Sequence, residues 1–361
     1  HTDKPNVKRT ASKPPRVSVV IATYDRPEML KHCIQAVQRQ TVTDWEALVI
    51  GDCCQPSTRE VIEAFEDPRI TYANLPARCG EQSIPNSVGL ALARASVVAF
   101  LNHDDYWLPD HLEIGLARLA ETGADLCTTS AVFATYASHK SYDVVLAESS
   151  PSWRRLQDVF GGPFFLFEPI SSWLVCRDRV LQLSPIGPAL AVARTPITDW
   201  LLRFWRAGLK HCNEERITVI KDNIRKQTKT PHYRQSSPMF PFIEALAAGK
   251  NPEGLREEIS IRQAAHLANG GRVRDFKVFN KPLALGVLPE GWNVEFTDDD
   301  ARVFLETGKD PYEEATRAAG LPLGSVLRAA LTNRTGETMH SQPTFEEMVE
   351  AARLQLSNQT Q

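Results

Sequence analysis

The feature that most constrains this chain is a repeated alternation of apolar runs and amphipathic stretches between residues 16 and 128. Runs rich in β-branched residues recur at 16–22, 45–50, 70–73 and 97–101, and the stretches between them carry apolar residues at helical spacing. Such strand–helix units with short connections predict a mainly parallel, Rossmann-like sheet with helices on both faces. The expected fold class is therefore α/β.

Polar side chains follow three of these predicted strands at their carboxyl ends. Tyr24 comes after the first strand, Asp52 after the second, and Asp104 after the strand at 97–101. In an open α/β sheet these ends lie along one edge, which is where ligands bind. An aromatic ring can stack on a base, a carboxylate can accept from a base N–H, and carboxylate oxygens suit Mg²⁺ or Mn²⁺. The pattern indicates a nucleotide crevice in which a metal neutralises a diphosphate, with Arg78 as a further candidate contact.

The acidic turn Asn102-His103-Asp104-Asp105 has a simpler alternative interpretation. It precedes a helical pattern that begins after Pro109, so it could serve only to cap that helix. The Gly-x-Gly-x-x-Gly fingerprint and the P-loop are both absent, which leaves phosphate binding to other groups.

Composition excludes several classes of protein. The net charge is −3 over 361 residues, so nothing points to nucleic acid, and no apolar run approaches the ~18 residues of a membrane span. The seven cysteines are odd in number and lack Cys-x-x-Cys spacing, which is typical of reduced thiols in a cytoplasmic protein. No signal peptide is visible, although the chain begins with His. The basic residues 1–15 are expected to form a disordered tail, either solvated or in peripheral contact with the inner face of the membrane.

A specific set of motifs occupies the same region: Val17-Ser-Val-Val-Ile-Ala-Thr-Tyr-Asp-Arg26, Gln40-Thr41, Trp45-Glu46, Asp52, Gly80, Asn86-x-x-Gly89 and Leu101-Asn-His-Asp-Asp-Tyr-Trp-Leu-Pro109. As a set they resemble the motifs of family 2 glycosyltransferases with the GT-A fold, well over residues 16–128 and weakly to about 210. The resemblance implies an inverting transferase that uses a nucleotide-diphosphate sugar, most often UDP-linked, with Mn²⁺ or Mg²⁺.

The resemblance also implies roles for individual residues. Tyr24 would stack on the base and Asp52 would bind its edge. Asp104 falls on the last residue of the family's D-x-D motif, the metal ligand, whereas Asn102 replaces its first Asp and can still bind a ribose hydroxyl or water. The expected nucleotide-sugar site consists of Thr23, Tyr24, Asp52, Arg78, Asn86, Asn102 and His103, and the expected metal ligands are Asp104 and Asp105.

A later carboxylate, Asp199, is the candidate general base. Residues 169–177 resemble the family's strand after the acceptor loop, and Thr198-Asp199 stands where the family usually reads Glu-Asp at the start of a helix. An inverting transfer needs a group that takes the acceptor's proton opposite the leaving diphosphate. Apolar neighbours predict partial burial and a raised pKa. The alternative is that Thr198 or Asp199 only caps the helix.

Residues 210–235 form a basic segment that could fold over the diphosphate. Its His232 is either a further metal ligand or part of a solvated loop.

From about residue 236 the pattern changes to short amphipathic runs joined by Gly, Pro and Asn. We therefore divide the chain into a tail (1–15), a GT-A domain (16–235) and a helical C-terminal extension (236–361) that shapes the acceptor side or a homodimer contact. The acidic run 297–300 is expected to cap a helix. Residues 312–328 have the rhythm of a helix-turn-helix, but the acidic balance there argues against DNA binding.

Three functions remain to be compared. The first is a metal-dependent inverting glycosyltransferase with a glycan, lipid-linked or peptide hydroxyl as acceptor. The second is a catalytically degenerate nucleotide-sugar binder, suggested by Asn102 and Thr198; the joint presence of Tyr24, Asp52, Asp104 and Asp199 favours the first. The third is a sugar nucleotidyltransferase, which would open with a Gly-rich loop where this chain has Thr23-Tyr24-Asp25-Arg26.

Overall fold

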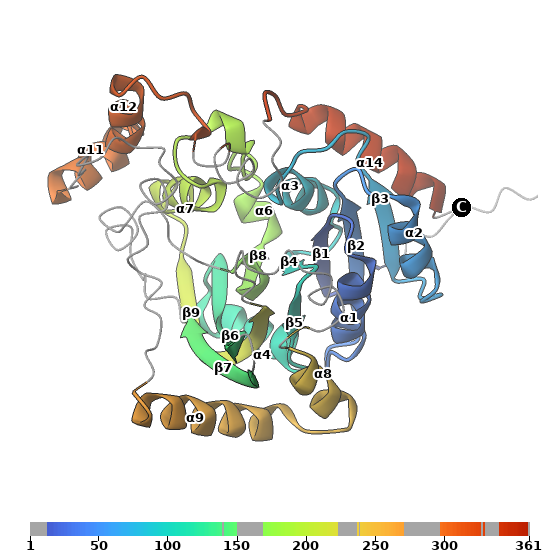
Figure 1. Ribbon diagram of the computed structural model, residues 1–361. Coiled ribbons are helices and arrows are strands. Elements are labelled where there is room, and N and C mark those ends of the chain that lie inside the picture. Colours follow the sequence, from blue (N-terminus) through green and yellow to red (C-terminus); the bar gives the residue numbers. More distant parts are fainter. Residues whose placement is uncertain are drawn as a thin grey trace, which may run out of the picture.

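The computed structural model describes residues 13–138, 141–149, 169–222, 237, 239–270, 297–325, 328 and 339–359, whose strands form a nine-stranded sheet (Figure 1). The first half of the sheet is parallel, in the order β3-β2-β1-β4. Every residue of β1 is buried, as its continuous apolar run predicts. These strands are β1 (Val17–Thr23), β2 (Trp45–Gly51), β3 (Ile70–Asn74) and β4 (Val97–Asn102).

The second half of the sheet is mixed. Beyond β4 the order continues β8-β6-β9-β5, with β7 paired to β6. Only the β6–β9 pairing is parallel in this half. The α/β class is confirmed, and antiparallel strands extend the parallel core that the sequence predicts. The strands are β5 (Asp105–Trp107), β6 (Leu126–Ser138), β7 (Ser141–Ser149), β8 (Trp173–Cys176) and β9 (His211–Asp222).

Helices cover both faces of the sheet and create two hydrophobic clusters. On one face α1, α2 and α4 pack with Val19 and Ile21 of β1, and on the other face α3 and α7 pack with Val20. Gly89 of α3 lies so close to β1 that an added Cβ would meet Val20 Cγ1 at 2.3 Å, which explains the glycine. The helices are α1 (Pro27–Gln38), α2 (Pro56–Glu63), α3 (Ser83–Leu92), α4 (His111–Thr122), α6 (Arg177–Val180) and α7 (Pro196–Arg206).

The described residues after 237 are mainly helical, and all of their helices except α12 contribute residues to the same two clusters. α8 and α9 join the cluster of α1 and α4, whereas α11 and α14 join that of α3 and α7. Thr297 caps α11 in a capping box with Asp300, as expected for the acidic run. These helices are α8 (Phe240–Ala247), α9 (Pro252–Ala268), α11 (Asp298–Thr307), α12 (Pro311–Ala318) and α14 (Phe345–Gln359).

The last helix, α14, lies along the edge strand β3 (Figure 1). The Gln355 amide receives the Asn74 N–H at 2.8 Å and donates to the Asn74 carbonyl at 2.7 Å. The Gln359 amide likewise accepts the Tyr72 N–H at 3.1 Å and donates to the Tyr72 carbonyl at 2.5 Å. Two side chains one helical turn apart therefore satisfy the outer backbone groups of two residues of β3.

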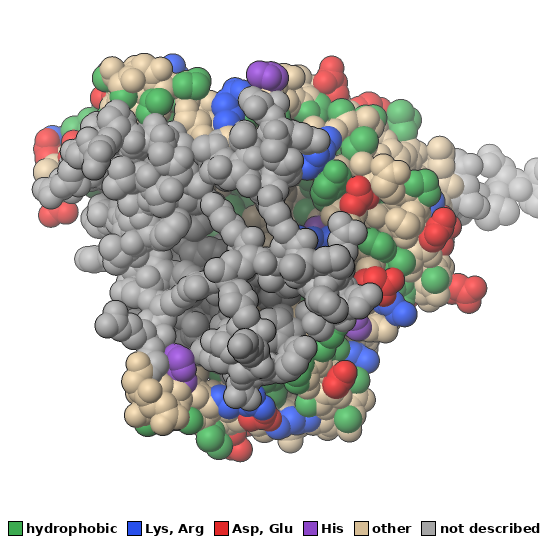
Figure 2. Space-filling model, viewed as in Figure 1, with side chains coloured by type: hydrophobic (Ala, Val, Ile, Leu, Met, Phe, Trp, Pro, Cys, Tyr) green, Lys and Arg blue, Asp and Glu red, His purple; other side chains and the backbone are tan. Residues whose placement is uncertain are grey.

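Charges on the described surface are mixed in sign. Figure 2 shows acidic and basic side chains close together along the lower edge, over α9. Ion pairs such as Arg262–Glu258, at 2.7 Å, account for part of this pattern. No helix in the described part of the chain combines the length and apolarity needed to cross a bilayer. Residues 223–235 of the basic segment, including His232, fall outside the described residues.

Candidate functional site

The ends of β1 and β4 meet through His103. The Tyr24 N–H donates to His103 Nδ1 at 3.1 Å, and the Thr23 hydroxyl lies 3.1 Å from the same nitrogen. An Nδ1 that accepts the amide proton leaves the proton of a neutral imidazole on Nε2. Thr23, Tyr24 and His103 therefore form one connected group at the carboxyl edge of the parallel strands.

Asp52, at the end of β2, holds the loop that follows β3. Its two carboxylate oxygens accept the Cys79 N–H at 2.5 Å and the Gly80 N–H at 2.8 Å. Burial raises the pKa of Asp52, and the two amide hydrogen bonds oppose that shift. Gly80 has a φ of 85°, which explains the glycine in this motif.

The same loop places Arg78 against Tyr24. The guanidinium carbon lies 4.3 Å from the centroid of the Tyr24 ring, a cation–π arrangement. Tyr24, Arg78 and Asp52 thus converge from three segments, as their positions at strand ends predict. The arrangement offers a ring, a cation and a carboxylate to one ligand.

The adjacent carboxylates Asp104 and Asp105 lie in different surroundings. The Asp104 side chain is 26% exposed, with Arg26 at 3.5 Å. Burial opposes its ionisation, but the positive charges of Lys221 and Arg26 and the neighbouring His103 ring together hold the pKa of Asp104 below its usual value. Asp104 is therefore a charged, accessible carboxylate.

Asp105 is fully buried and belongs to an internal ion pair. Lys221 Nζ lies 3.0 and 3.1 Å from its two oxygens, and the Ser171 hydroxyl donates to Oδ2 at 2.5 Å. Burial raises the pKa of Asp105 to about 6, although Lys221 opposes the shift. The structure therefore does not bring Asp105 and Asp104 together as the expected pair of metal ligands, because Asp105 points into the mixed half of the sheet.

Asn102 and Asn86 take different positions at this edge. The Asn102 backbone N–H donates to Ser171 Oγ at 2.9 Å, so Ser171 links it to Asp105. The Asn86 side chain is 1% exposed, and neither of its polar atoms has a partner among the described residues. A buried amide in this state is available to a ligand that enters beside α3.

Asp199 lies in the first turn of α7, as expected for the candidate base. Arg203 Nε donates to its Oδ2 at 3.0 Å, and the side chain is 30% exposed. Burial raises the pKa of Asp199 despite Arg203. Neither Asp199 nor Thr198 makes a side-chain capping bond to the helix, so the capping alternative finds no support.

Arg203 also ties α7 towards α3. It donates to the carbonyls of Ser184 and Pro185 at 2.7 and 3.0 Å. The next residue, Ile186, donates its N–H to Ser87 Oγ at 2.9 Å. A continuous series of contacts therefore runs from Asp199 to the helix that carries Asn86.

Four further residues belong to this arrangement, and sequence reasoning did not assign them a role. Ser171 and Lys221 lay in segments that the sequence had marked only as a strand and as part of a basic run. Arg26 stood in a recognised motif without a role. Gln342 donates to the Cys79 carbonyl at 2.6 Å and accepts the Leu190 N–H at 3.0 Å, a bridge with no local signal in the sequence.

The described residues contain no cluster of three or more His, Cys, Asp or Glu side chains that could hold a metal by themselves. Asp104 alone suits a cation whose other ligands are waters and donor phosphates, which is how Mg²⁺ commonly binds. Asp105, already neutralised by Lys221, does not suit one.

Residues 18–178 match the family model of glycosyl transferase family 2. The putative colanic acid biosynthesis glycosyl transferase WcaA of Escherichia coli K12 is 28% identical over 106 residues, covering 29% of this chain and 38% of that protein. The Escherichia coli UDP-Glc:alpha-D-GlcNAc-diphosphoundecaprenol beta-1,3-glucosyltransferase WfgD is 29% identical over 103 residues, covering 28% and 40%. These matches thus span about two fifths of each relative.

Among solved structures, residues 1–349 of Staphylococcus aureus TarS in complex with UDP superpose with a TM-score of 0.47 and 13% identity. That likeness covers 92% of this chain and 99% of the TarS fragment, and at this score it carries no argument on function.

Proposed function

We propose that the protein is an inverting glycosyltransferase, because residues 18–178 match the model of glycosyl transferase family 2. It moves a sugar from a nucleotide-diphosphate donor, most simply a UDP-sugar, to a hydroxyl acceptor. The observation that carries the proposal is the convergence of Tyr24, Arg78, Asp52 and His103 at the carboxyl edge of the parallel strands.

The donor occupies this edge. The base stacks on Tyr24, whose ring already carries the Arg78 guanidinium, and Asp52 accepts a base N–H with a lone pair that the loop amides leave available. The Asn86 amide of α3, which has no partner among the described residues, binds the ribose or the sugar. His103, held by the Tyr24 amide, lines the pocket near the diphosphate.

Asp199 is the general base. It accepts the proton of the acceptor hydroxyl as that oxygen attacks the anomeric carbon from the face opposite the leaving diphosphate. The raised pKa of Asp199 suits this role, because a base works best when its pKa is near the working pH. Arg203 keeps the carboxylate oriented and anchors α7 to the loop at 184–186.

Asp104 is the protein ligand that would hold a divalent Mg²⁺ or Mn²⁺ ion together with the donor's phosphates. When bound, such an ion neutralises negative charge on the diphosphate leaving group. Arg26, 3.5 Å from Asp104, lies where it can contact the same phosphates. Asp105 has a structural role in this scheme.

The acceptor is a glycan, lipid-linked or peptide hydroxyl. The name of WfgD specifies a UDP-glucose donor and a diphosphoundecaprenol-linked sugar as acceptor, which favours a lipid-linked glycan here. A lipid-linked acceptor places the enzyme at the cytoplasmic face of the membrane, where reduced cysteines are expected; all seven are free.

A catalytically degenerate nucleotide-sugar binder is the second candidate, and the replacement of the first D-x-D carboxylate by Asn102 favours it. Both candidate functions predict that the nucleotide binds, but only the transferase predicts that the sugar is transferred. A degenerate protein would bind the nucleotide but release none from the sugar donor.

Calorimetry with UDP, GDP, dTDP and CMP, each with Mn²⁺ and with EDTA, tests the donor assignment. We expect UDP to bind most tightly and the wild-type protein to gain affinity from Mn²⁺, whereas Asp104→Asn should lose that gain. Asp178→Asn, on the surface at α6 with an 82% exposed side chain, is the control and should behave as wild type. An Asp104→Asn variant that still responds to Mn²⁺ would remove Asp104 from the site.

A further inference from the structure

Two cysteines face each other across the pairing of β6 and β9. Cys127 and Cys212 are register partners in this parallel ladder. Neighbouring strands lie roughly 4.8 Å apart, which falls within the ~4.4–6.8 Å that separates the Cα atoms of a disulfide. Both side chains contact the same hydrophobic cluster. The pair therefore has the geometry to become a disulfide with little backbone movement.

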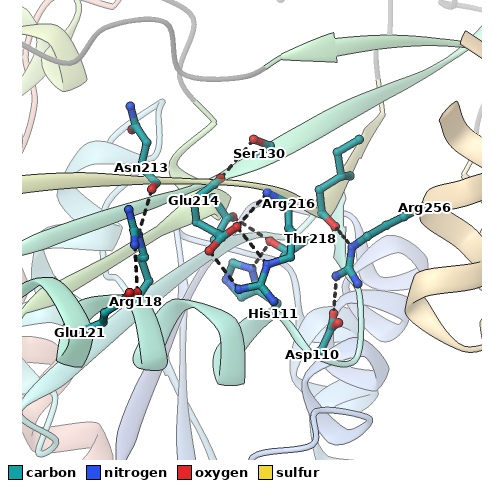
Figure 3. Close-up of polar contacts among 12 residues, drawn as sticks. Asp110, His111, Arg118, Glu121, Ser130, Asn213, Glu214, Arg216, Thr218 and Arg256 are labelled. Carbon is teal, nitrogen blue, oxygen red and sulfur yellow. Dashed lines mark hydrogen bonds and ion pairs between the residues drawn. The ribbon is translucent and has the colours of Figure 1, made fainter.

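Only one of the two thiols is accessible. Cys127 is fully buried, whereas Cys212 is partly exposed and lines a cavity of about 500 Å³. Arg118 of α4 borders this cavity and donates to the Asn213 carbonyl at 3.2 Å (Figure 3). The cavity is at the start of β9, while Lys221 and the candidate active site are near its end. A small reagent can thus reach Cys212 without entering the donor site.

The surroundings also distinguish the two thiols electrostatically. The neighbouring Cys127 thiol lowers the pKa of Cys212, burial opposes this shift, and Thr122 and the charge of Arg118 add to the lowering. The neighbouring Cys212 thiol and burial together raise the pKa of Cys127. Since the thiolate is the nucleophile, Cys212 is the attacking group and Cys127 the one that reacts second.

We propose that Cys127 and Cys212 form a dithiol site that reacts with a small-molecule disulfide of the glutathione type and closes to an intrachain disulfide. The Cys212 thiolate attacks one sulfur of the reagent, whose S–S bond breaks and releases one thiol after protonation. Cys127 then loses its proton and attacks Cys212 Sγ, which expels the second thiol. Two protein thiols are oxidised by two electrons, and one small disulfide is reduced to two thiols.

Other cysteines of the chain provide matched controls. Cys53 is exposed, and the next residue, Cys54, is buried. Cys176 is partly exposed on β8, where the register partner of Cys127 is Leu174 and not Cys176. Neither Cys53 nor Cys176 is the register partner of another cysteine in the described strand pairings, so each should carry a glutathione adduct or remain free.

The test is to incubate the full chain with glutathione disulfide, quench with acid, alkylate under denaturing conditions and map peptides by mass spectrometry without reduction. We expect a linked pair of peptides that contain Cys127 and Cys212, and its loss after dithiothreitol. In Cys127→Ser the adduct should stay on Cys212, and in Cys212→Ser the Cys127 thiol should stay unmodified. A wild-type chain that keeps the adduct on Cys212, or in which Cys212 reacts no faster than Cys176, would overturn the proposal.

Discussion

The two halves of the sheet use their polar residues differently. At the edge of the parallel half, Asp52 and His103 are held by backbone N–H groups and remain next to Tyr24 and Arg78. In the mixed half, Asp105 is held by side chains, those of Lys221 and Ser171, and is removed from solvent. Backbone contacts leave carboxylate lone pairs for a ligand, whereas a buried ion pair consumes them.

The difference teaches how two adjacent acids acquire separate roles. The Asp104 side chain lies at the edge of the parallel half, where it stays charged and accessible. Asp105 is the first residue of β5, and its side chain points into the mixed half. In the proposed function, the parallel half therefore carries the donor site, and the mixed half supports it structurally.

Asp199, on the helix that leads into β9, is the one carboxylate outside the parallel half to which we assign chemistry. Asp199→Asn should reduce transfer by a factor of about 10²–10⁴ while UDP affinity and fold remain. Because burial raises the pKa of Asp199, the wild-type rate should begin to fall on acidification at a higher pH than for an ordinary carboxylate. The rate of the Asp199→Asn variant should not show this fall at acidic pH. Initial rates against pH with a competent acceptor provide the measurement. Near-normal turnover would assign the proton to another group.

Lys221→Met tests whether the mixed half is mainly structural. Removal of one partner of a buried ion pair should cost about 3–5 kcal/mol of unfolding free energy. The folded-state pKa of Asp105, about 6 with Lys221 present, lies above its unfolded value, so folding favours the protonated acid. The loss should therefore be largest above pH 6 and shrink towards pH 4.

Urea unfolding at several pH values measures this effect. The double variant Lys221→Met/Asp105→Asn is the control and should recover part of the stability, since it leaves no buried charge unpaired. An equal loss at pH 4 and pH 7 would mean that the charge of Asp105 is not the cause.

Asp52→Ala and Asp125→Ala compare the halves directly. Both acids hold a loop: Asp125 accepts the Lys210 N–H at 2.9 Å and pairs with Arg179 at 3.1 Å. Asp52→Ala should weaken UDP binding by about 1–3 kcal/mol, because a base N–H loses its partner. Asp125→Ala should destabilise the fold without a change in UDP affinity, measured by calorimetry. Equal UDP affinity in the two variants would reduce Asp52 to a loop anchor.

Gln342→Ala should have the smallest effect. This side chain bridges the loop held by Asp52 and the segment at 189–191 that precedes α7. Loss of two hydrogen bonds, each worth about 0.5–1.5 kcal/mol, should raise the Kd for UDP a few-fold. Gln355→Ala removes two similar hydrogen bonds to Asn74 and should leave the Kd unchanged. Identical Kd values for the two variants would show that Gln342 does not position the donor loop.

The sequence was most informative where structure depends on local pattern. The strands and helices of the parallel half follow from apolar periodicity, and the strand-end positions of Tyr24, Asp52 and Asp104 follow from topology. The pairing of Lys221 with Asp105 joins positions 116 residues apart in the chain, so neither periodicity nor a motif reveals it. The helices after residue 236 were predictable as helices, but their docking sites depend on side-chain packing that no local signal reports.

The glutamines of α14 have a consequence for the protein's behaviour in concentrated solution. An outer strand with unpaired N–H and C=O groups can template the addition of another chain, which leads to strand-swapped oligomers or fibrils. Gln355 and Gln359 occupy these positions on β3 with amide groups that imitate a neighbouring backbone. Because these side chains offer no row of backbone N–H and C=O groups to a further strand, the sheet cannot be extended past them. The final helix thus acts as a terminator of polymerisation, and shortening the protein at this end would expose a surface on which aggregates nucleate.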